Sequence, residues 1–333
     1  MAGAYCVTGA SGYIGSWLIK SLLQRGYTVH ATVRDPAKVL HFFSQWTDTD
    51  RLRLFQADLQ VEGSFDEAVK GCNGVFHVAA SMEFDIHVKE NIDTYVQSNI
   101  INPAIKGILN LLKACLKSKS VKRVVLTSSI STITAKDSTG KWRPVVDESC
   151  QSLIDHVYVL SKLLTEKAAF KFANENNIDL VSVITSTVGG PFLTPSVPTS
   201  IHVLLSPVTG DSKFFSILSA VNARMGSIAL VHIEDICNAH IFLMENPRAE
   251  GPYICCAKSC LMSELIDLLK QEHHSSSLHR IESDYQGPIP CEISSKKLRD
   301  LGFTYKHVTI EDIIHQTIAT CVDCGFLPPP IAN

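Results

Sequence analysis

The stretch Ala4-Tyr5-Cys6-Val7-Thr8-Gly9-Ala10-Ser11-Gly12-Tyr13-Ile14-Gly15 decides the fold of this chain. A short apolar segment, typical of a buried strand, leads into three glycines at three-residue spacing, and apolar residues at helical spacing follow. Such glycines allow a tight turn, close approach of the backbone to a pyrophosphate, and close packing of the next helix. A loop that only needs positive φ is the alternative, but the flanking strand and helix favour a dinucleotide site. The predicted contacts are Gly9, Ser11, Gly12, Tyr13, Ile14 and Gly15.

Strand and helix patterns alternate over the first half of the chain. Apolar strands are predicted at 28–33, 52–57, 74–80, 121–128 and 180–185, with helices at 102–117 and 159–174. Repeated βα units with continuous apolar strands require a parallel sheet covered on both faces. The predicted fold is therefore a doubly wound α/β (Rossmann) sheet.

The composition of the sequence changes near residue 190, where several prolines occur in a region rich in Ser and Thr. We therefore predict a nucleotide-binding domain over 1–190. Residues 191–333 are expected to form mainly a smaller, α-rich lobe for substrate, with some segments returning to the first domain. Helices are predicted in it at 261–272, 294–301 and 310–324.

Composition restricts the class of partner. The chain has 333 residues, 45% hydrophobic and 19% charged, and a formal net charge of −3 with no basic run. This excludes the electrostatic footprint of a nucleic-acid or membrane-surface binder and favours small molecules as partners. The first predicted strand begins near Met1 and no apolar run reaches membrane-spanning length, so we expect a cytoplasmic protein, monomeric or weakly homodimeric.

The eleven cysteines are scattered through apolar segments, which favours reduced core thiols over a disulfide framework. Cys321 and Cys324 form a C-x-x-C pair without a second pair of ligands, so no metal is predicted. A redox role for this pair is the alternative to two thiols at a helix end.

Three residues carry the predicted chemistry. Tyr158 and Lys162 are four positions apart and so share a helical face, while Ser129 follows the strand at 121–128, where ligands bind in such sheets. An ammonium beside a phenol stabilises the phenolate, which suits tyrosine to proton transfer with a carbonyl. A serine hydroxyl can donate to the developing oxyanion. Ser131 and Thr132 lie close to Ser129, so the register in this cluster stays open, and strand-end capping is its alternative role.

These motifs resemble the extended short-chain dehydrogenases, and within them the plant dihydroflavonol reductase and anthocyanidin reductase group. The resemblance covers nearly the whole chain, and its motifs are those at 8–18, 31–36, 71–79, 124–129 and 231–242. It implies a catalytic triad of Ser129, Tyr158 and Lys162, with NADP(H) as the cofactor.

The resemblance also implies further cofactor contacts. Arg34, at the end of the second strand, would accommodate the 2′-phosphate of NADP with Lys38 as a second cation, although the neighbouring Asp35 would suit NAD. The other implied contacts, for which strand-end packing is the alternative, are Asp58, Leu59, Val78, Ala79, Ala80, Thr127, Tyr158, Lys162, Thr185, Thr187, Val188 and Ser200.

The sequence departs from this group where substrate would bind. Dihydroflavonol reductases carry an asparagine shortly after the serine pair, whereas Thr134 stands in this region and cannot reproduce two-ended amide hydrogen bonding. Thr185 replaces a usual proline, and the segment 150–157 before Tyr158 is several residues shorter than in relatives. A short lead-in could displace the tyrosine. The residues predicted to contact substrate are Met82, Phe84, Ser129, Thr134, Phe192 and Met225.

The function expected from these residues and this resemblance is NADPH-dependent reduction of a carbonyl or related conjugated group in a flavonoid-like plant phenolic. Two alternatives stay open. The first is reduction of another plant metabolite, such as an alkaloid ketone, an aldehyde or a cinnamoyl thioester. The second is a non-catalytic NADP-binding sensor or scaffold, which the short segment before Tyr158 would suit.

Overall fold

The computed structural model describes residues 3–39, 42–43, 46, 49–80, 92–150, 157–273 and 289–329. They divide into two compact units that interleave along the sequence. Unit 1 comprises Met1–Thr132, Ile154–Ile184 and Cys237–Pro252, and unit 2 comprises Ile133–Leu153, Thr185–Ile236 and Tyr253–Asn333. The predicted boundary at residue 190 differs from this division at 133–153, which belong to unit 2. Residues 237–252 belong to unit 1.

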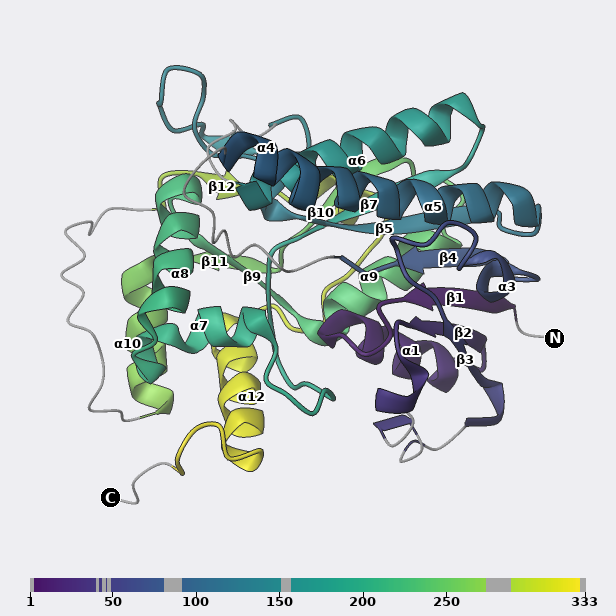
Figure 1. Ribbon diagram of the computed structural model, residues 1–333. Helices are drawn as coiled ribbons and strands as arrows, with labels where there is room; N and C mark the ends of the chain where they lie inside the picture. The colour runs from purple at the N-terminus through teal and green to yellow at the C-terminus, as the bar shows by residue number, and fades with distance from the viewer. Residues whose placement is uncertain are drawn as a thin grey trace. The chain divides into compact units, whose positions relative to one another are not determined.

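A seven-stranded sheet dominates unit 1 (Figure 1), with strand order β10-β7-β5-β4-β1-β2-β3. Its strands are β1 (Ala4–Thr8), β2 (Thr28–Val33), β3 (Leu52–Gln56), β4 (Gly74–His77), β5 (Arg123–Ser129), β7 (Leu180–Thr185) and β10 (Gly251–Cys255), the last of which runs on into unit 2. Strands β1 to β5 pair in parallel. The strand order reverses between β1 and β4, and such a reversal is where open α/β sheets bind ligands.

Helices cover both faces of this sheet. On one face lie α5 (Asn102–Ser118), α6 (Val157–Glu175) and the short α3 (Asp66–Val69), whose apolar residues pack on β1, β4 and β5 in one buried cluster. On the other face lies α1 (Tyr13–Gln24) (Figure 1), and Arg25 just after it donates to Asn238 of α9 (Ile233–Glu245) at 2.8 Å. This arrangement confirms the predicted doubly wound fold.

Short helical segments complete unit 1. They are the 3-10 helices η1 (Pro36–Lys38), η2 (Thr49–Arg51) and η4 (Ile130–Thr132), the helix α4 (Ile92–Val96) and a π-helical turn η3 (Gln97–Ile101) that runs into α5. The buried Arg123 of β5 donates to the carbonyl oxygens of Leu243, Asn246 and Ala249 and forms an ion pair with Asp179 at 2.8 Å. This side chain thereby fixes β5 to the end of α9 and to the segment after it.

Unit 2 contains two small sheets as well as helices. One has the order β11-β9-β8, from Lys258–Cys260, Ile228–His232 and Thr187–Gly189, and the other pairs β12 (Glu292–Ile293) with β6 (Val145–Val146). The helices are α7 (Thr199–Thr209), α8 (Ser212–Met225), α10 (Met262–Glu272), α11 (Lys296–Asp300) and α12 (Ile310–Asp323). The three helices predicted near the C-terminus therefore exist. The strands escaped prediction because they have two to five residues, too few to show a period.

All eleven cysteines are free thiols, and ten of them are buried, as predicted for reduced core residues. Cys324 is exposed just after α12, and its sulfur lies 3.4 Å from the carbonyl oxygen of Cys321. Among the described residues, no helix combines the length and apolar character that crossing a bilayer would require.

Candidate active site

The glycine turn after β1 is packed so closely that two of its glycines admit no side chain. Gly9 has φ +69°, and a Cβ placed on it would lie 2.9 Å from the Cα of Ala79, just after β4. A Cβ on Gly15 would lie 2.2 Å from the carbonyl oxygen of Gly9. The backbones of the turn, of α1 and of the end of β4 are thereby brought into contact at the point where the strand order reverses.

Gly12 differs from its neighbours because a Cβ there would make one close contact and no severe clash. Its φ of −84° suits any residue, and a Cβ there would meet only the carbonyl oxygen of Gly9, at 3.3 Å. Gly12 is the N-cap of α1, and no side chain caps that helix. Uncapped amides at a helix N-terminus fit a pyrophosphate. Ser11 is exposed at this end, and Tyr13 and Ile14 are partly buried.

Thr8 joins the ends of β1 and β4 through its hydroxyl. Its Oγ1 accepts the backbone N–H groups of Val78 and Ala79, each at 3.1 Å, and lies 2.8 Å from Nδ1 of His77. Because the hydroxyl oxygen already accepts two bonds, its hydrogen points to Nδ1, and His77 carries its proton on Nε2. Burial, together with the Lys162 charge, lowers the pKa of His77 to about 3. His77 is therefore neutral at physiological pH.

Arg34 and Asp35, which follow β2, differ in their surroundings. Arg34 is exposed at the strand end. The Asp35 carboxylate accepts the N–H of Ala37 at 3.1 Å and pairs with Lys38 at 3.7 Å, so it caps η1. A carboxylate engaged in this way is not presented to ribose hydroxyls as it would be in an NAD site, and the residues here fit a 2′-phosphate better.

The segment after β3 is held by its own hydrogen bonds. The Asp58 carboxylate accepts the N–H of Gln60 at 2.8 Å, and the Leu59 carbonyl accepts from Asn110 of α5 at 2.8 Å. Leu59 also packs against Gly107, where a Cβ would approach it to 2.9 Å. After β4, Val78 and Ala79 are partly buried and Ala80 is exposed.

Ser129 ends β5 in a geometry suited to hydrogen-bond donation. Its Oγ accepts the backbone N–H of Ser131 at 3.2 Å, so its own hydroxyl hydrogen is what it has to offer another oxygen. Its carbonyl accepts the hydroxyl of Thr132 at 2.9 Å, which starts η4. Thr127, two residues earlier, lies 2.8 Å from Nε2 of His240 in α9. Ser131, the alternative candidate for the role given to Ser129, has a buried hydroxyl.

Helix α6 carries Tyr158 and Lys162 in its first two turns, four residues apart as predicted. Both are partly buried. The Lys162 charge reaches His77 of β4, whose protonation it disfavours, and Glu166 one turn further along α6. The ends of β4 and β5 and the start of α6 therefore belong to one electrostatic environment within unit 1. The segment 151–156, which precedes Tyr158, lies outside the described residues.

Most residues predicted to contact substrate, or the nicotinamide end of the cofactor, belong to unit 2. Thr134 is buried, donates its N–H to the Cys150 carbonyl at 3.0 Å and accepts the N–H of Lys136 at 3.3 Å. Met225 is also buried, at the end of α8. The remaining predicted residues of this unit are partly buried apart from Val188, which is buried; they are Thr185, Thr187, Phe192 and Ser200. Met82 and Phe84 lie outside the described residues.

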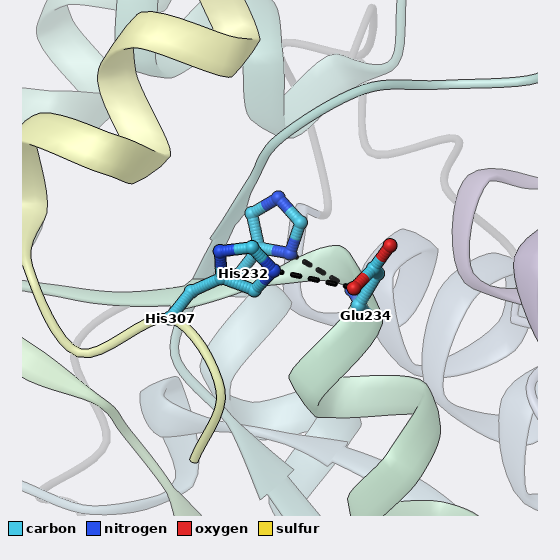
Figure 2. A group of neighbouring side chains, drawn as sticks. All are labelled: His232, Glu234 and His307. Atoms are coloured by element: carbon cyan, nitrogen blue, oxygen red, sulfur yellow. Dashed lines mark hydrogen bonds and ion pairs between the residues drawn. The ribbon is translucent and has the colours of Figure 1, made fainter.

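Unit 2 also contains a cluster that sequence reasoning missed, formed by His232, Glu234 and His307 (Figure 2). The two imidazole rings have centroids 3.7 Å apart and planes inclined at 34°, and Nε2 of His307 lies 3.2 Å from Glu234. Their ligand atoms lie within 4.8 Å of one another, close enough for metal binding. Neighbouring protein groups already engage them, however. Glu234 pairs with Lys306 at 2.6 Å, and Nδ1 of His307 contacts Asp312.

The glycine turn, the strand-end serine and the Tyr-Lys helix define a nucleotide-binding α/β protein of the short-chain dehydrogenase type. The chain belongs to the NAD dependent epimerase/dehydratase family, whose model matches residues 5–255. This confirms the family that the sequence motifs predicted, and with it the class of NAD(P)-dependent oxidoreductase.

Relatives in plants share nearly the whole chain. It is 45% identical to a Ginkgo biloba protein provisionally named an anthocyanidin reductase, over 97% of this chain and 95% of that one. It is 41% identical to the bifunctional dihydroflavonol 4-reductase/flavanone 4-reductase of Malus domestica, over 98% and 92%. Among solved structures it is similar to vestitone reductase from alfalfa, with a TM-score of 0.78, 33% identity and coverage of 98% and 100%.

Proposed function

We propose that this protein is an NADPH-dependent reductase of a carbonyl or related conjugated group in a flavonoid-like phenolic. The observation that carries the proposal is the placement of Ser129, Tyr158 and Lys162 in the same unit as the glycine turn, on β5 and α6. The named activities of the flavonoid reductases to which the chain is similar support it.

Each residue of the triad has a separate task in this proposal. NADPH, when bound, supplies the hydride. Ser129 donates its hydroxyl hydrogen to the substrate oxygen, because its Oγ already accepts the Ser131 N–H. Tyr158 delivers a proton to that oxygen, and the Lys162 ammonium stabilises the phenolate that remains. His77 is held neutral nearby, so it adds no positive charge that would compete with Lys162.

We propose that the cofactor is held by the turn at Gly12 and selected by Arg34. The first site offers the uncapped start of α1, and the second an exposed guanidinium at the end of β2 beside an aspartate that is engaged elsewhere. Other predicted cofactor residues support this proposal by their position: Asp58 and Leu59 follow β3, Val78, Ala79 and Ala80 follow β4, and Thr127 lies near the end of β5. The cytoplasmic location and the monomeric or weakly dimeric state expected from the sequence stay predictions.

Thr134 supports a substrate other than the usual dihydroflavonol. A threonine has no side-chain amide that could both donate to and accept from a flavonoid hydroxyl. Its own hydroxyl is buried and accepts the Lys136 N–H. This favours a substrate whose recognition needs no amide at this position, such as an anthocyanidin.

The experiment follows NADPH oxidation with a panel of flavonoids, an alkaloid ketone, an aldehyde and a cinnamoyl thioester, beside NADPH binding measured by fluorescence. Turnover on a flavonoid that is lost in Tyr158→Phe, with NADPH binding kept, supports the proposal. Turnover confined to another class of carbonyl corrects the substrate. Tight NADPH binding without oxidation on any compound contradicts the enzymatic role and favours a sensor.

A further inference from the structure

Helix α6 carries an acid on the same face as the two proposed catalytic residues. Glu166 lies one turn beyond Lys162 and two turns beyond Tyr158, because positions four apart fall on one side of a helix. It lies at the level of strands β5 and β7, and serines from both strands reach its carboxylate.

The two carboxylate oxygens each accept one serine hydroxyl from a different strand. Ser128 of β5 donates to Oε2 at 3.0 Å, and Ser182 of β7 donates to Oε1 at 2.5 Å. Ser128 directly precedes Ser129. The carboxylate therefore connects the helix that carries the proposed proton donor to the strand that carries the proposed oxyanion donor.

The same carboxylate interacts with the charge of Lys162. Burial raises the pKa of Glu166, and the Ser182, Ser128 and Thr132 hydroxyls together with the Lys162 ammonium oppose that rise. Those three hydroxyls and that ammonium are the groups of β5, η4, β7 and α6 that act on it. The hydroxyl donors and a cation one turn away favour the charged form of Glu166, against the burial that disfavours it.

We propose that Glu166 is a positioning residue for the reaction. Its negative charge holds the Lys162 ammonium in place and offsets part of the field that this ammonium exerts at Tyr158. Its bond to Ser128 fixes the end of β5 against α6, and so fixes Ser129 relative to the helix. This proposal rests on the proposed function, since it acts through Lys162 and Ser129.

The first test is the alkaline limb of the pH–rate profile for reduction in Glu166→Gln. In reduction the proton donor must keep its proton, so the rate falls as pH rises. Without the Glu166 charge, the ammonium stabilises the phenolate more, and the limb should move to lower pH. A separation of about 12 Å along the helix gives a shift of roughly 0.5 to 1 pH unit.

A second test separates positioning from stability. Ser128→Ala and Ser182→Ala each remove one hydroxyl that favours the charged form of the carboxylate, but only Ser128 connects it to β5. We expect kcat to fall about tenfold in Ser128→Ala with an unchanged KM for NADPH, because misplaced groups cost large factors in rate. Ser182→Ala should keep kcat and lose only thermal stability.

The outcomes are distinct. An unshifted limb in Glu166→Gln, or equal kcat in the two serine variants, would overturn the positioning role. If Glu166→Gln does not fold, the serine pair alone decides the matter. Tyr158→Phe serves as the control for the proposed function: full turnover in that variant would refute the triad itself, and that result is independent of what Glu166 does.

Discussion

Gly9 and Gly12 lie three residues apart in the same turn, yet the structure indicates that glycine is needed at each of them for a different reason. Gly9→Ala places a residue at φ +69° with its Cβ 2.9 Å from the backbone of Ala79. The left-handed conformation costs about 1–2 kcal/mol and the overpacking about 1–3 kcal/mol, so the free energy of unfolding should fall by about 2–5 kcal/mol.

Gly12→Ala meets no such obstacle. Its φ and ψ are −84° and 172°, which alanine adopts freely, and the 3.3 Å approach to the Gly9 carbonyl costs only a small adjustment. The reduced entropy of the unfolded chain offsets that cost by about 0.4–1 kcal/mol, so the unfolding free energy should stay within about 0.5 kcal/mol of the parent. The new methyl group would instead stand where the pyrophosphate approaches, and NADPH affinity should fall at least about tenfold, or about 1.4 kcal/mol.

The assay pairs urea unfolding of the protein without cofactor with NADPH titration by fluorescence, on both variants and the parent. Gly9→Ala should lose stability, and Gly12→Ala should lose affinity alone. Equal destabilisation of the two variants, or parent-like NADPH affinity in Gly12→Ala, would refute the assignment of Gly12 to the ligand.

Three further predictions concern unit 1. Thr8→Val leaves two backbone amides and Nδ1 of His77 without their shared hydroxyl, so urea unfolding should show a loss of about 2–3 kcal/mol; a loss below 0.5 kcal/mol would contradict the network. His77 binds a proton near its ordinary pKa when unfolded but only at about 3 when folded, so stability falls as pH drops below about 6.5. Between pH 7 and pH 5 the parent should therefore lose about 2 kcal/mol more than His77→Gln, and equal losses would show that His77 titrates normally. Arg34→Ser should raise KM for NADPH about tenfold or more and leave KM for NADH unchanged, and equal effects on both would remove Arg34 from the 2′-phosphate site.

Local pattern predicted the central sheet well, because its strands are buried on both faces and therefore apolar throughout. Strands β2 and β7 have the predicted bounds, and α5 and α6 extend the predicted helices by one to three residues. Strand β4 ends at His77, three residues before its apolar run does, because Val78 and Ala79 donate to Thr8 instead of continuing as a strand. Apolar character alone does not distinguish an amide that pairs with a neighbouring strand from one that donates to a side chain.

The division between the units was harder to foresee. Residues 133–153 belong to unit 2, although they follow β5 directly in sequence and contain a strand of only two residues, β6. Its partner β12 lies about 150 positions later along the chain. A local sequence pattern cannot show pairing between strands so far apart along the chain. A boundary placed where prolines accumulate therefore could not identify the first passage of the chain into unit 2, at residue 133.

The candidate site shows the same limit at the level of single side chains. Tyr158 and Lys162 were predictable because both lie on one helix, where spacing fixes the shared face. Glu166 has the same spacing again, but a glutamate on a long helix is usually solvated, and its hydrogen bonds to the serines of β5 and β7 show only in the structure. Burial of an acid costs free energy that two hydroxyl bonds and one nearby ammonium offset only in part, as the raised pKa of Glu166 indicates. An apolar side chain there would pack at lower cost, so an acid at this position is in keeping with the positioning role that we propose for it.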